Sequence, residues 1–264
     1  MFGRVASRWG AVWLAALLAC VPVRSAIEAP FERPADIVAD ALSVAFAPDI
    51  ASVSTEEPLP DLGLFGLAST RMANGDISAK WKAVSAQIAV DNETLAHCRA
   101  HAQTCRLAAR KFLTIVDEGL HASGRARIGI VNRAVNLAIE PMSDMAQWGV
   151  ADRWSPPLET FATGRGDCED YAIAKYVALT AAGVPAKDVK LVIVHNTAAN
   201  EDHAITAVQI DGDWVLLDNR WLTLVADKAM RQATPLFVLD DDGVRKFTPP
   251  VVAGTPSEPR PASL

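Results

Sequence analysis

The sequence predicts an α+β fold, in which a block of helices comes first and a block of antiparallel strands follows. Apolar residues recur at intervals of three and four between Ile77 and Ile139, as they do on one face of amphipathic helices. After Val189 they come in short runs bounded by turn signals, as in strands. A further helical pattern runs from Cys168 to Ala182, between the two blocks. Separate blocks of helices and strands favour a helix packed on an antiparallel sheet.

The N-terminal block divides into three helices or so. Gly119 and Ser123-Gly124 mark the break before the last of them, and Pro141 ends it. The stretch from Trp148 to Asp167 is rich in glycine and proline, so we expect it to be loop. The expected strands are residues 189–195, 203–210, 214–217, 222–225 and 236–239.

The chain changes character outside this core. We expect a signal peptide in residues 1–26, a loosely ordered lead-in in 27–76, a single folded domain in 77–247 and a proline-rich tail in 248–264. The net charge is −6, and the lysines and arginines are scattered along the chain. Nothing here resembles the basic field that phosphate backbones require, so we expect no nucleic-acid partner.

The first residues have the layout of an export signal. Two arginines precede an apolar run of 13 residues from Ala11 to Val23. This run is shorter than the roughly 20 residues of a membrane-spanning helix. We therefore expect an exported, soluble protein, cleaved after Ala26 or a few residues later. The alternative is a lipobox at residues 17–20, which would leave Cys20 attached to lipid.

Removal of the signal would leave Cys98, Cys105 and Cys168. In an oxidising compartment an odd number of cysteines commonly means one disulfide and one free thiol. On one straight helix the spacing of Cys98 and Cys105 would separate them by roughly 10 Å, which is too far for a bridge. We favour a disulfide between them, which requires an intervening turn; the alternative is two buried thiols. Cys168 is then the free thiol.

Cys168 begins a helix directly after a turn that contains Gly164 and Gly166. A thiol at this position meets unpaired N–H groups and the positive end of the helix dipole, and both favour the thiolate. A lone cysteine in a helix is nevertheless more often a small buried residue than a nucleophile. The assignment therefore needs a second feature.

The second feature is a hairpin. Asp211-Gly212 predicts a two-residue turn between a strand that begins at His203 and a strand that reaches Asp218. In this register His203 lies opposite Arg220, so His203 and Asp218 are diagonal neighbours on one face, roughly 7–8 Å apart. A slip of one residue would place them on opposite faces.

Cys168, His203 and Asp218 together have the residue types of a thiol hydrolase. The histidine would take the thiol proton and later protonate the leaving amine, and the aspartate would fix the histidine tautomer. Each residue alone has a structural explanation, but their combination is hard to obtain by accident. His195 is a rival base, although we expect no acidic partner placed to orient it.

Three carboxylates surround the thiol: Asp167, Glu169 and Asp170. They raise the pKa of a neighbouring thiol, so a counter-charge is expected. Three acids at a glycine-rich turn suit a hard cation with oxygen ligands, and Ca²⁺ better than Mg²⁺ because the loop is irregular. The alternative is a helix N-terminus that carries acids for its dipole, without a metal.

Five strings carry a family resemblance: Val131-Asn132, Val135-Asn136, Asp152 to Glu159, Gly166 to Tyr176, and His203 with Leu217-Asp218-Asn219. In these strings residues 77–239 resemble the bacterial transglutaminase-like cysteine proteinase family, which includes LapG-type periplasmic proteases. The resemblance implies a papain-like or transglutaminase-like core, a triad of Cys168, His203 and Asp218, and calcium dependence through the acids beside the nucleophile.

The resemblance also implies a biological role. Such proteases are periplasmic and cleave the N-terminal region of a large surface adhesin, often at an Ala-Ala pair, which disperses biofilm. An inner-membrane receptor for cyclic di-GMP holds them inactive through its periplasmic domain. Two alternatives stay open: acyl transfer to an amine on the same triad, as in a transglutaminase or amidase, and a non-enzymatic secreted binding module.

Overall fold

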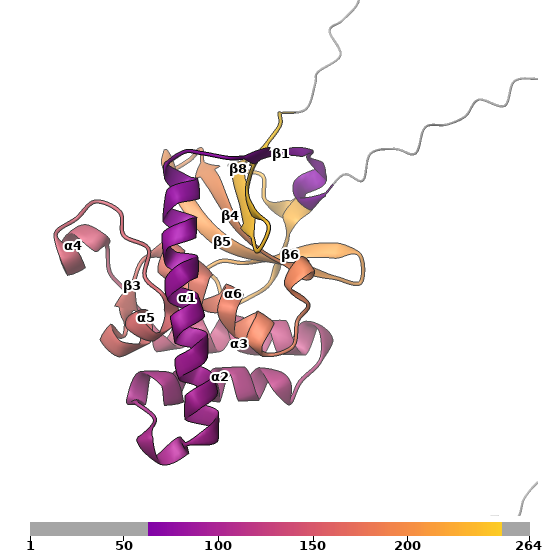
Figure 1. The fold of residues 1–264 in the computed structure, drawn as a ribbon. Helices are drawn as coiled ribbons and strands as arrows, with labels where there is room; N and C mark the ends of the chain where they lie inside the picture. The colour runs from indigo at the N-terminus through magenta and orange to yellow at the C-terminus, as the bar shows by residue number, and fades with distance from the viewer. Residues whose placement is uncertain (1–62, 250–264) are drawn as a thin grey trace, which may run out of the picture. The chain divides into compact units, whose positions relative to one another are not determined.

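The structure, a computed structural model, describes residues 63–249. In this part of the chain three helices come first: α1 (Asp76–Ala100), α2 (Leu107–Leu120) and α3 (Gly124–Ala138). They match the three helices predicted from the apolar spacing. Figure 1 shows α1 running from the edge of the sheet near β1 towards α2.

Helix α6 (Cys168–Ala181) lies at the centre of the fold and is buried from Glu169 to Leu179. It packs against the other helices on one side and against strands β4 and β5 on the other. The side chain of Thr206 on β5 donates a hydrogen bond to the carbonyl oxygen of Ala172, 2.9 Å away. A helix buried on nearly every face fixes the position of its first residue, Cys168.

Close packing around α6 depends on Gly119. A Cβ atom added at Gly119 would lie 2.9 Å from the Cβ of Ala182 and 3.0 Å from Cγ2 of Val131. Real Cβ atoms rarely approach so closely, so a larger residue would push α2 away from α3 and α6. The glycine that the sequence marks as a helix break is therefore also a packing residue.

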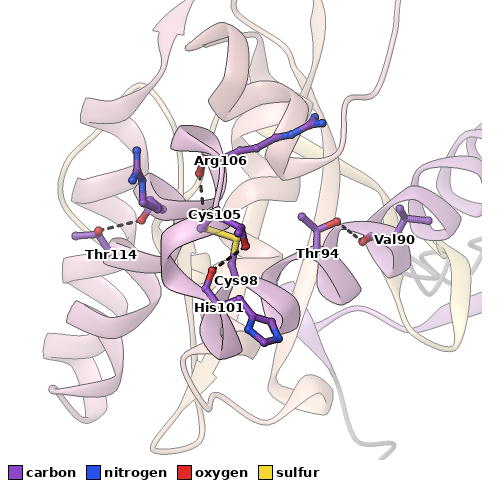
Figure 2. The surroundings of a disulfide bond; sticks show 9 residues. Val90, Thr94, Cys98, His101, Cys105, Arg106 and Thr114 are labelled. Carbon is purple, nitrogen blue, oxygen red and sulfur yellow. Dashed lines mark hydrogen bonds between the residues drawn. A yellow bond between two sulfur atoms is a disulfide. The ribbon is translucent and has the colours of Figure 1, made fainter.

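The predicted disulfide is present between Cys98 and Cys105, whose Cα atoms are 4.9 Å apart (Figure 2). Helix α1 ends at Ala100, and the short 3-10 helix η2 (Ala102–Thr104) reverses the chain. This is the turn that the spacing of the two cysteines required. The bridge joins the end of α1 to the segment that leads into α2.

The sheet has seven strands in the order β1-β9-β8-β4-β5-β6-β7, and every pairing is antiparallel. Its strands are β1 (Ser69–Met72), β4 (Val189–Asn196), β5 (Glu201–Ile210), β6 (Asp213–Leu217), β7 (Val225–Ala226), β8 (Ala233–Asp240) and β9 (Gly243–Phe247). Helices α1, α3 and α6 contact this sheet. The predicted α+β class is confirmed.

Three details differ from the sequence prediction. The end of the expected lead-in, residues 27–76, contains the 3-10 helix η1 (Leu64–Gly66) and β1, which pairs with β9 at the edge of the sheet. Strand β9 was not predicted, because five residues give too little alternation to recognise. The strand expected at 222–225 is wrong, since only the two-residue β7 forms there.

The stretch expected to be loop, from Trp148 to Asp167, contains helix α5 (Pro157–Thr163). Its prolines are a helix start, with Pro157 at the first turn, and Gly164 ends it in the left-handed conformation. Seven residues are too few to show helical spacing of apolar residues. The short helix α4 (Asp144–Trp148) also precedes this stretch, between β2 (Glu140–Pro141) and β3 (Arg165–Gly166).

The predicted signal peptide, the alternative anchor at Cys20 and most of the predicted tail lie outside the described residues. Among residues 63–249, no helix has the length and apolar character needed to cross a membrane.

Candidate active site

The β5–β6 hairpin has the predicted register. Ile210 pairs with Asp213 and Thr206 pairs with Leu217, across a turn in which Asp211 and Gly212 both have positive φ angles of 53° and 83°. Such a turn matches the twist of the strands that it joins. The register puts His203 and Asp218 on one face of the sheet.

The side chains of His203 and Asp218 meet there. Nε2 of His203 lies 3.1 Å from Oδ1 of Asp218, and both side chains are buried. With Nε2 engaged by the carboxylate, Nδ1 is the ring nitrogen left to exchange a proton with a neighbour.

Arg220 holds the other side of the Asp218 carboxylate. Its backbone N–H donates to Oδ1 at 2.9 Å, and its guanidinium donates to Oδ2 from Nη2 at 2.8 Å and to both oxygens from Nε. Burial raises the pKa of Asp218, but hydrogen bonds from His203 and Arg220 outweigh it and hold the pKa well below its usual range. Asp218 is therefore an ionised carboxylate in a fixed orientation.

Cys168 is the first residue of α6 and the free cysteine among the described residues. Its thiol lies 3.2 Å from Oε2 of Glu169, to which it donates. Burial raises the pKa of the thiol, the charges of Glu169 and Asp167 raise it further, and the N–H of Ala204 lowers it. The net direction is strongly upward, as the sequence predicted from the flanking acids. The helix dipole alone does not produce a thiolate here.

Cys168 and His203 line the same cleft, which has a volume of about 290 Å³. The cleft lies between the start of α6 and strands β4 and β5, and its other lining residues include Ile77, Trp154, Ile193 and Ala204. A thiol, an imidazole and an apolar wall thus face one space. This arrangement can bind a peptide bond beside a nucleophile and a base.

His195, the rival base, differs from expectation. The sequence suggested no acidic partner for it, but His195 lies directly opposite Asp202 on β5, with Nδ1 2.9 Å from Oδ1. The partner was missed because it depends on the β4–β5 register, which no short turn defines. His195 does not line the cleft that contains Cys168. The His195–Asp202 contact is exposed, so it contributes little to stability.

A cluster of three acids lies beside Cys168. One carboxylate oxygen from each of Asp144, Asp167 and Glu169 lies within 4.8 Å of the others. Two of these residues were predicted as ligands, and Asp144 was not. Parallel pairing of β2 with β3 brings the chain around Asp144 to the chain around Asp167, and the N–H of Asp144 donates to Oδ2 of Asp167 at 3.2 Å.

Asp170, the third predicted ligand, is not part of this cluster. Its Oδ1 accepts a hydrogen bond of 2.8 Å from the N–H of Ser155, and its side chain packs on Gly166. A Cβ atom at Gly166 would lie only 2.5 Å from Oδ2 of Asp170. The one-residue spacing on the helix turns Asp170 away from Glu169. Burial, followed by the charges of Asp167 and Asp144, raises the pKa of Asp170 to about 7.

The acid cluster has the donor set of a hard-cation site. Oδ1 of Asp144 and Oδ1 of Asp167 are buried and have no hydrogen-bond partner among the described residues. Burial and the charge of Asp167 raise the pKa of Glu169 to about 9. Like-charged carboxylates at this distance destabilise one another unless a cation joins them. Carboxylate oxygens are the ligands that Ca²⁺ prefers, so the residues present fit calcium.

Sequence reasoning assigned no role to four residues that shape the site. Asp144 lies 23 residues from Asp167, so no local spacing links them. Arg220 is two residues after Asp218, a spacing that allows its guanidinium to bind the Asp218 carboxylate but does not require it. Lys175 and Asn136 reach the Asp218 segment from α6 and α3. A lysine and an asparagine inside amphipathic helices give no signal of their partners.

Comparison with solved structures finds similar folds, and two LapG structures are among them. Calcium-bound LapG from Legionella pneumophila is 21% identical, with a TM-score of 0.50 over 58% of this chain and 87% of that chain. A second LapG structure from that organism is 20% identical, with a TM-score of 0.49 over 59% and 87%. No curated protein sequence matches the chain.

The sequence itself decides the family. Residues 87–230, which are more than half of the chain, match the family described as bacterial transglutaminase-like cysteine proteinase. The matched region contains the thiol at the start of α6, the β5–β6 hairpin and the acid cluster. The chain therefore belongs to the bacterial transglutaminase-like cysteine proteinase family and is a cysteine protease.

Proposed function

We propose that the protein is a periplasmic, calcium-dependent endopeptidase with Cys168 as nucleophile, His203 as general base and Asp218 as the residue that orients the histidine. The observation that carries the proposal is the 3.1 Å contact between Nε2 of His203 and Oδ1 of Asp218. It occurs in a site that also contains a free thiol, Cys168, at the start of helix α6. The shared cleft supports it, because both reactive groups are open to one substrate.

The roles follow from the two ring nitrogens of His203. Because Nε2 faces Asp218, Nδ1 takes the proton from Sγ of Cys168. The thiolate attacks the peptide carbonyl carbon, and the backbone N–H of Cys168 is a candidate donor to the oxyanion. The tetrahedral intermediate collapses to a thioester as Nδ1–H protonates the leaving amine. Water, deprotonated by the same nitrogen, then releases the carboxylic acid product and the free thiol.

The acids beside the thiol explain a calcium requirement. Asp144, Asp167 and Glu169 would hold the ion, which would neutralise their charge and so favour the thiolate of Cys168. The unpartnered oxygens of Asp144 and Asp167 support this assignment. A similar fold, LapG of Legionella pneumophila, has a calcium-bound structure, which also agrees with it.

The proposed substrate is the N-terminal region of a large surface adhesin, whose release would control biofilm attachment. We also propose that an inner-membrane receptor for cyclic di-GMP captures the protease through its periplasmic domain. Membership of the family supports both proposals. The export signal predicted for residues 1–26 would deliver the protein to the compartment where both partners are accessible.

The test is cleavage of a recombinant N-terminal adhesin fragment from the same bacterium. Wild-type protein should cut it with calcium, EGTA should stop the cleavage, and added calcium should restore it. Cys168→Ala and His203→Ala should be inactive, whereas His195→Ala, the matched histidine on the next strand, should retain full activity.

Mass spectrometry of the products separates hydrolysis from acyl transfer, because hydrolysis leaves a new carboxyl terminus and acyl transfer leaves an amide to the acceptor amine. Cleavage by Cys168→Ala would refute the nucleophile assignment. Cleavage that EGTA does not change would refute only the calcium requirement.

A further inference from the structure

The chain leaves the sheet immediately before Asp218. Strand β6 ends at Leu217, and Thr206–Leu217 is the last pair of the β5–β6 ladder. Beyond this point the ladder supplies no partner for the carbonyl groups of the segment from Asp218 to Leu222. Within the segment, the N–H of Trp221 donates to the carbonyl oxygen of Asp218 at 3.4 Å, so the backbone that carries the carboxylate is held by this long turn hydrogen bond and by side chains.

Two asparagines on α3 supply that support. Nδ2 of Asn136 donates to the carbonyl oxygens of Asp218, at 3.0 Å, and Trp221, at 2.9 Å. Nδ2 of Asn132 donates to the carbonyl oxygens of Trp221 and Leu222, both at 3.3 Å. The two asparagines are four residues apart and therefore lie on the same face of the helix.

Lys175 holds the same segment from α6. Its Nζ donates to the carbonyl oxygen of Leu217 at 3.2 Å, and its side chain is fully buried. The carbonyl groups of residues 217 and 218 thus each receive a side-chain donor from a different helix. Because α6 also carries Cys168, the backbone at Asp218 is tied to the helix of the nucleophile.

The side-chain chemistry explains why amides are used. Each asparagine faces two carbonyl oxygens, so it must present N–H groups, and an aspartate would bring oxygen against oxygen. Oδ1 of Asn132 and Oδ1 of Asn136 are buried with no hydrogen-bond partner among the described residues. A buried oxygen without a hydrogen-bond partner lowers the stability of the fold. Stability alone therefore does not explain why two asparagines occupy these positions.

We propose that Asn136, supported by Asn132, is a positioning residue that holds Asp218 in register with His203. The inference rests on the proposed triad. Asn136 contacts no substrate atom in this scheme; it acts on the backbone of Asp218, whose side chain must remain within hydrogen-bond distance of Nε2 of His203. The NxxxN spacing on α3 is thereby assigned a role in catalysis.

The experiment compares Asn136→Ala, Asn132→Ala and Arg133→Ala, using cleavage of the adhesin fragment with calcium. Arg133 is exposed on the same helix and serves as the control. Asn136→Ala should lower kcat by about 10- to 100-fold and change KM by less than about twofold, because it displaces a catalytic group without removing binding surface. Asn136→Ser, which keeps one donor, should be intermediate and replaces Asn136→Ala should that variant not fold.

The two asparagine variants should differ in whether they mainly lower stability or mainly lower activity. Asn132 is fully buried and donates to Trp221 and Leu222 rather than to Asp218, so Asn132→Ala should lower the Tm more and kcat less than Asn136→Ala. In an Asp218→Ala background, Asn136→Ala should cause no further loss of kcat, since the group that it positions is gone. The positioning role would be refuted if Asn136→Ala lowered kcat equally in the wild-type and Asp218→Ala backgrounds. It would also be refuted if the loss of kcat across the variants were proportional to the loss of Tm.

A second readout does not depend on turnover. The Nε2 proton of His203 in its hydrogen bond to Asp218 is observable by NMR of protein labelled at histidine nitrogen, with assignment from His203→Gln among the 5 histidines. Asn136→Ala should shift or remove this signal, and Arg133→Ala should not. An unchanged signal would refute the inference. Failure of wild-type protein to cleave the fragment would instead refute the proposed substrate, and the signal would still decide on Asn136.

Discussion

The two ends of the candidate triad are built in opposite ways. Asp218 is surrounded by donors, from His203 and from the fork of Arg220, and its pKa is held low. Cys168 donates to the Glu169 carboxylate, and burial with the charges of Glu169 and Asp167 raises its pKa. Hydrogen-bond donors therefore surround the aspartate, whereas negatively charged carboxylates lie beside the cysteine.

This difference shows which part of the site the chain can complete alone. The carboxylate is ionised and oriented by residues of the protein itself. The thiol lies beside Asp144, Asp167 and Glu169, and two of these carboxylates have an unpartnered buried oxygen. We infer that the aspartate end is preorganised at all times, and that the thiol end becomes competent only with a cation.

The largest effect is expected at the acid cluster. Asp144→Asn should weaken calcium activation by about 10- to 100-fold, as judged by the calcium concentration for half-maximal cleavage, because it removes a charged ligand. Glu140→Gln is the control, since Glu140 lies on the neighbouring strand β2, is exposed and paired with Arg165, and does not line the cleft. The NMR signal of His203 should be the same in both variants. A changed signal in Asp144→Asn would show that the two ends are not independent.

A smaller effect is expected at Lys175, which joins the two ends. Burial lowers its pKa to about 7 in the folded protein, against about 10.4 in the unfolded chain. Between these values the unfolded chain holds the proton and the folded protein does not, so the free energy of unfolding rises with pH. The stability that the neutral Lys175 amine contributes is fully present above the unfolded pKa of about 10.4. It is lost as the pH falls towards the folded pKa of about 7.

Denaturant unfolding of wild-type protein and Lys175→Met tests this. The difference between their free energies of unfolding should change by up to about 1.4 kcal/mol per pH unit above pH 7, in favour of wild type as the pH rises. Lys175→Met should also lose the hydrogen bond to the carbonyl of Leu217, and we expect a several-fold lower kcat. A pH-independent difference would mean that the buried amine keeps its proton.

The predictable parts of the fold and site are those that local rules determine. The Asp211-Gly212 turn fixes the hairpin register, and from it the His203–Asp218 contact follows without any tertiary information. The start of α6 at Cys168 follows from the glycine-rich turn before it. The disulfide was favoured over two buried thiols on condition that a turn separates the cysteines, and η2 supplies that turn.

The parts that were missed depend on contacts between distant segments. Asp144 joins the acid cluster because β2 pairs with β3, and each of these strands has only two residues. Asp202 meets His195 through a β4–β5 register that no tight turn defines. The same holds for Asn136, whose partners are more than 80 residues away in the chain. A residue pattern on one helix does not indicate which distant carbonyl it will meet.

The smallest effect on catalysis is expected from the disulfide, which belongs to neither end of the triad. Replacing Cys98 and Cys105 by serine removes a constraint on a short loop, and we expect a loss of about 2–3 kcal/mol in the free energy of unfolding. The bridge lies at the C-terminal end of α1 (Figure 2), and neither cysteine lines the cleft that contains Cys168 and His203. Below its Tm, the double variant should therefore keep kcat within about twofold of wild type. A larger loss of kcat at a temperature where the variant is fully folded would show that the order of the helical block influences the reactivity of the thiol.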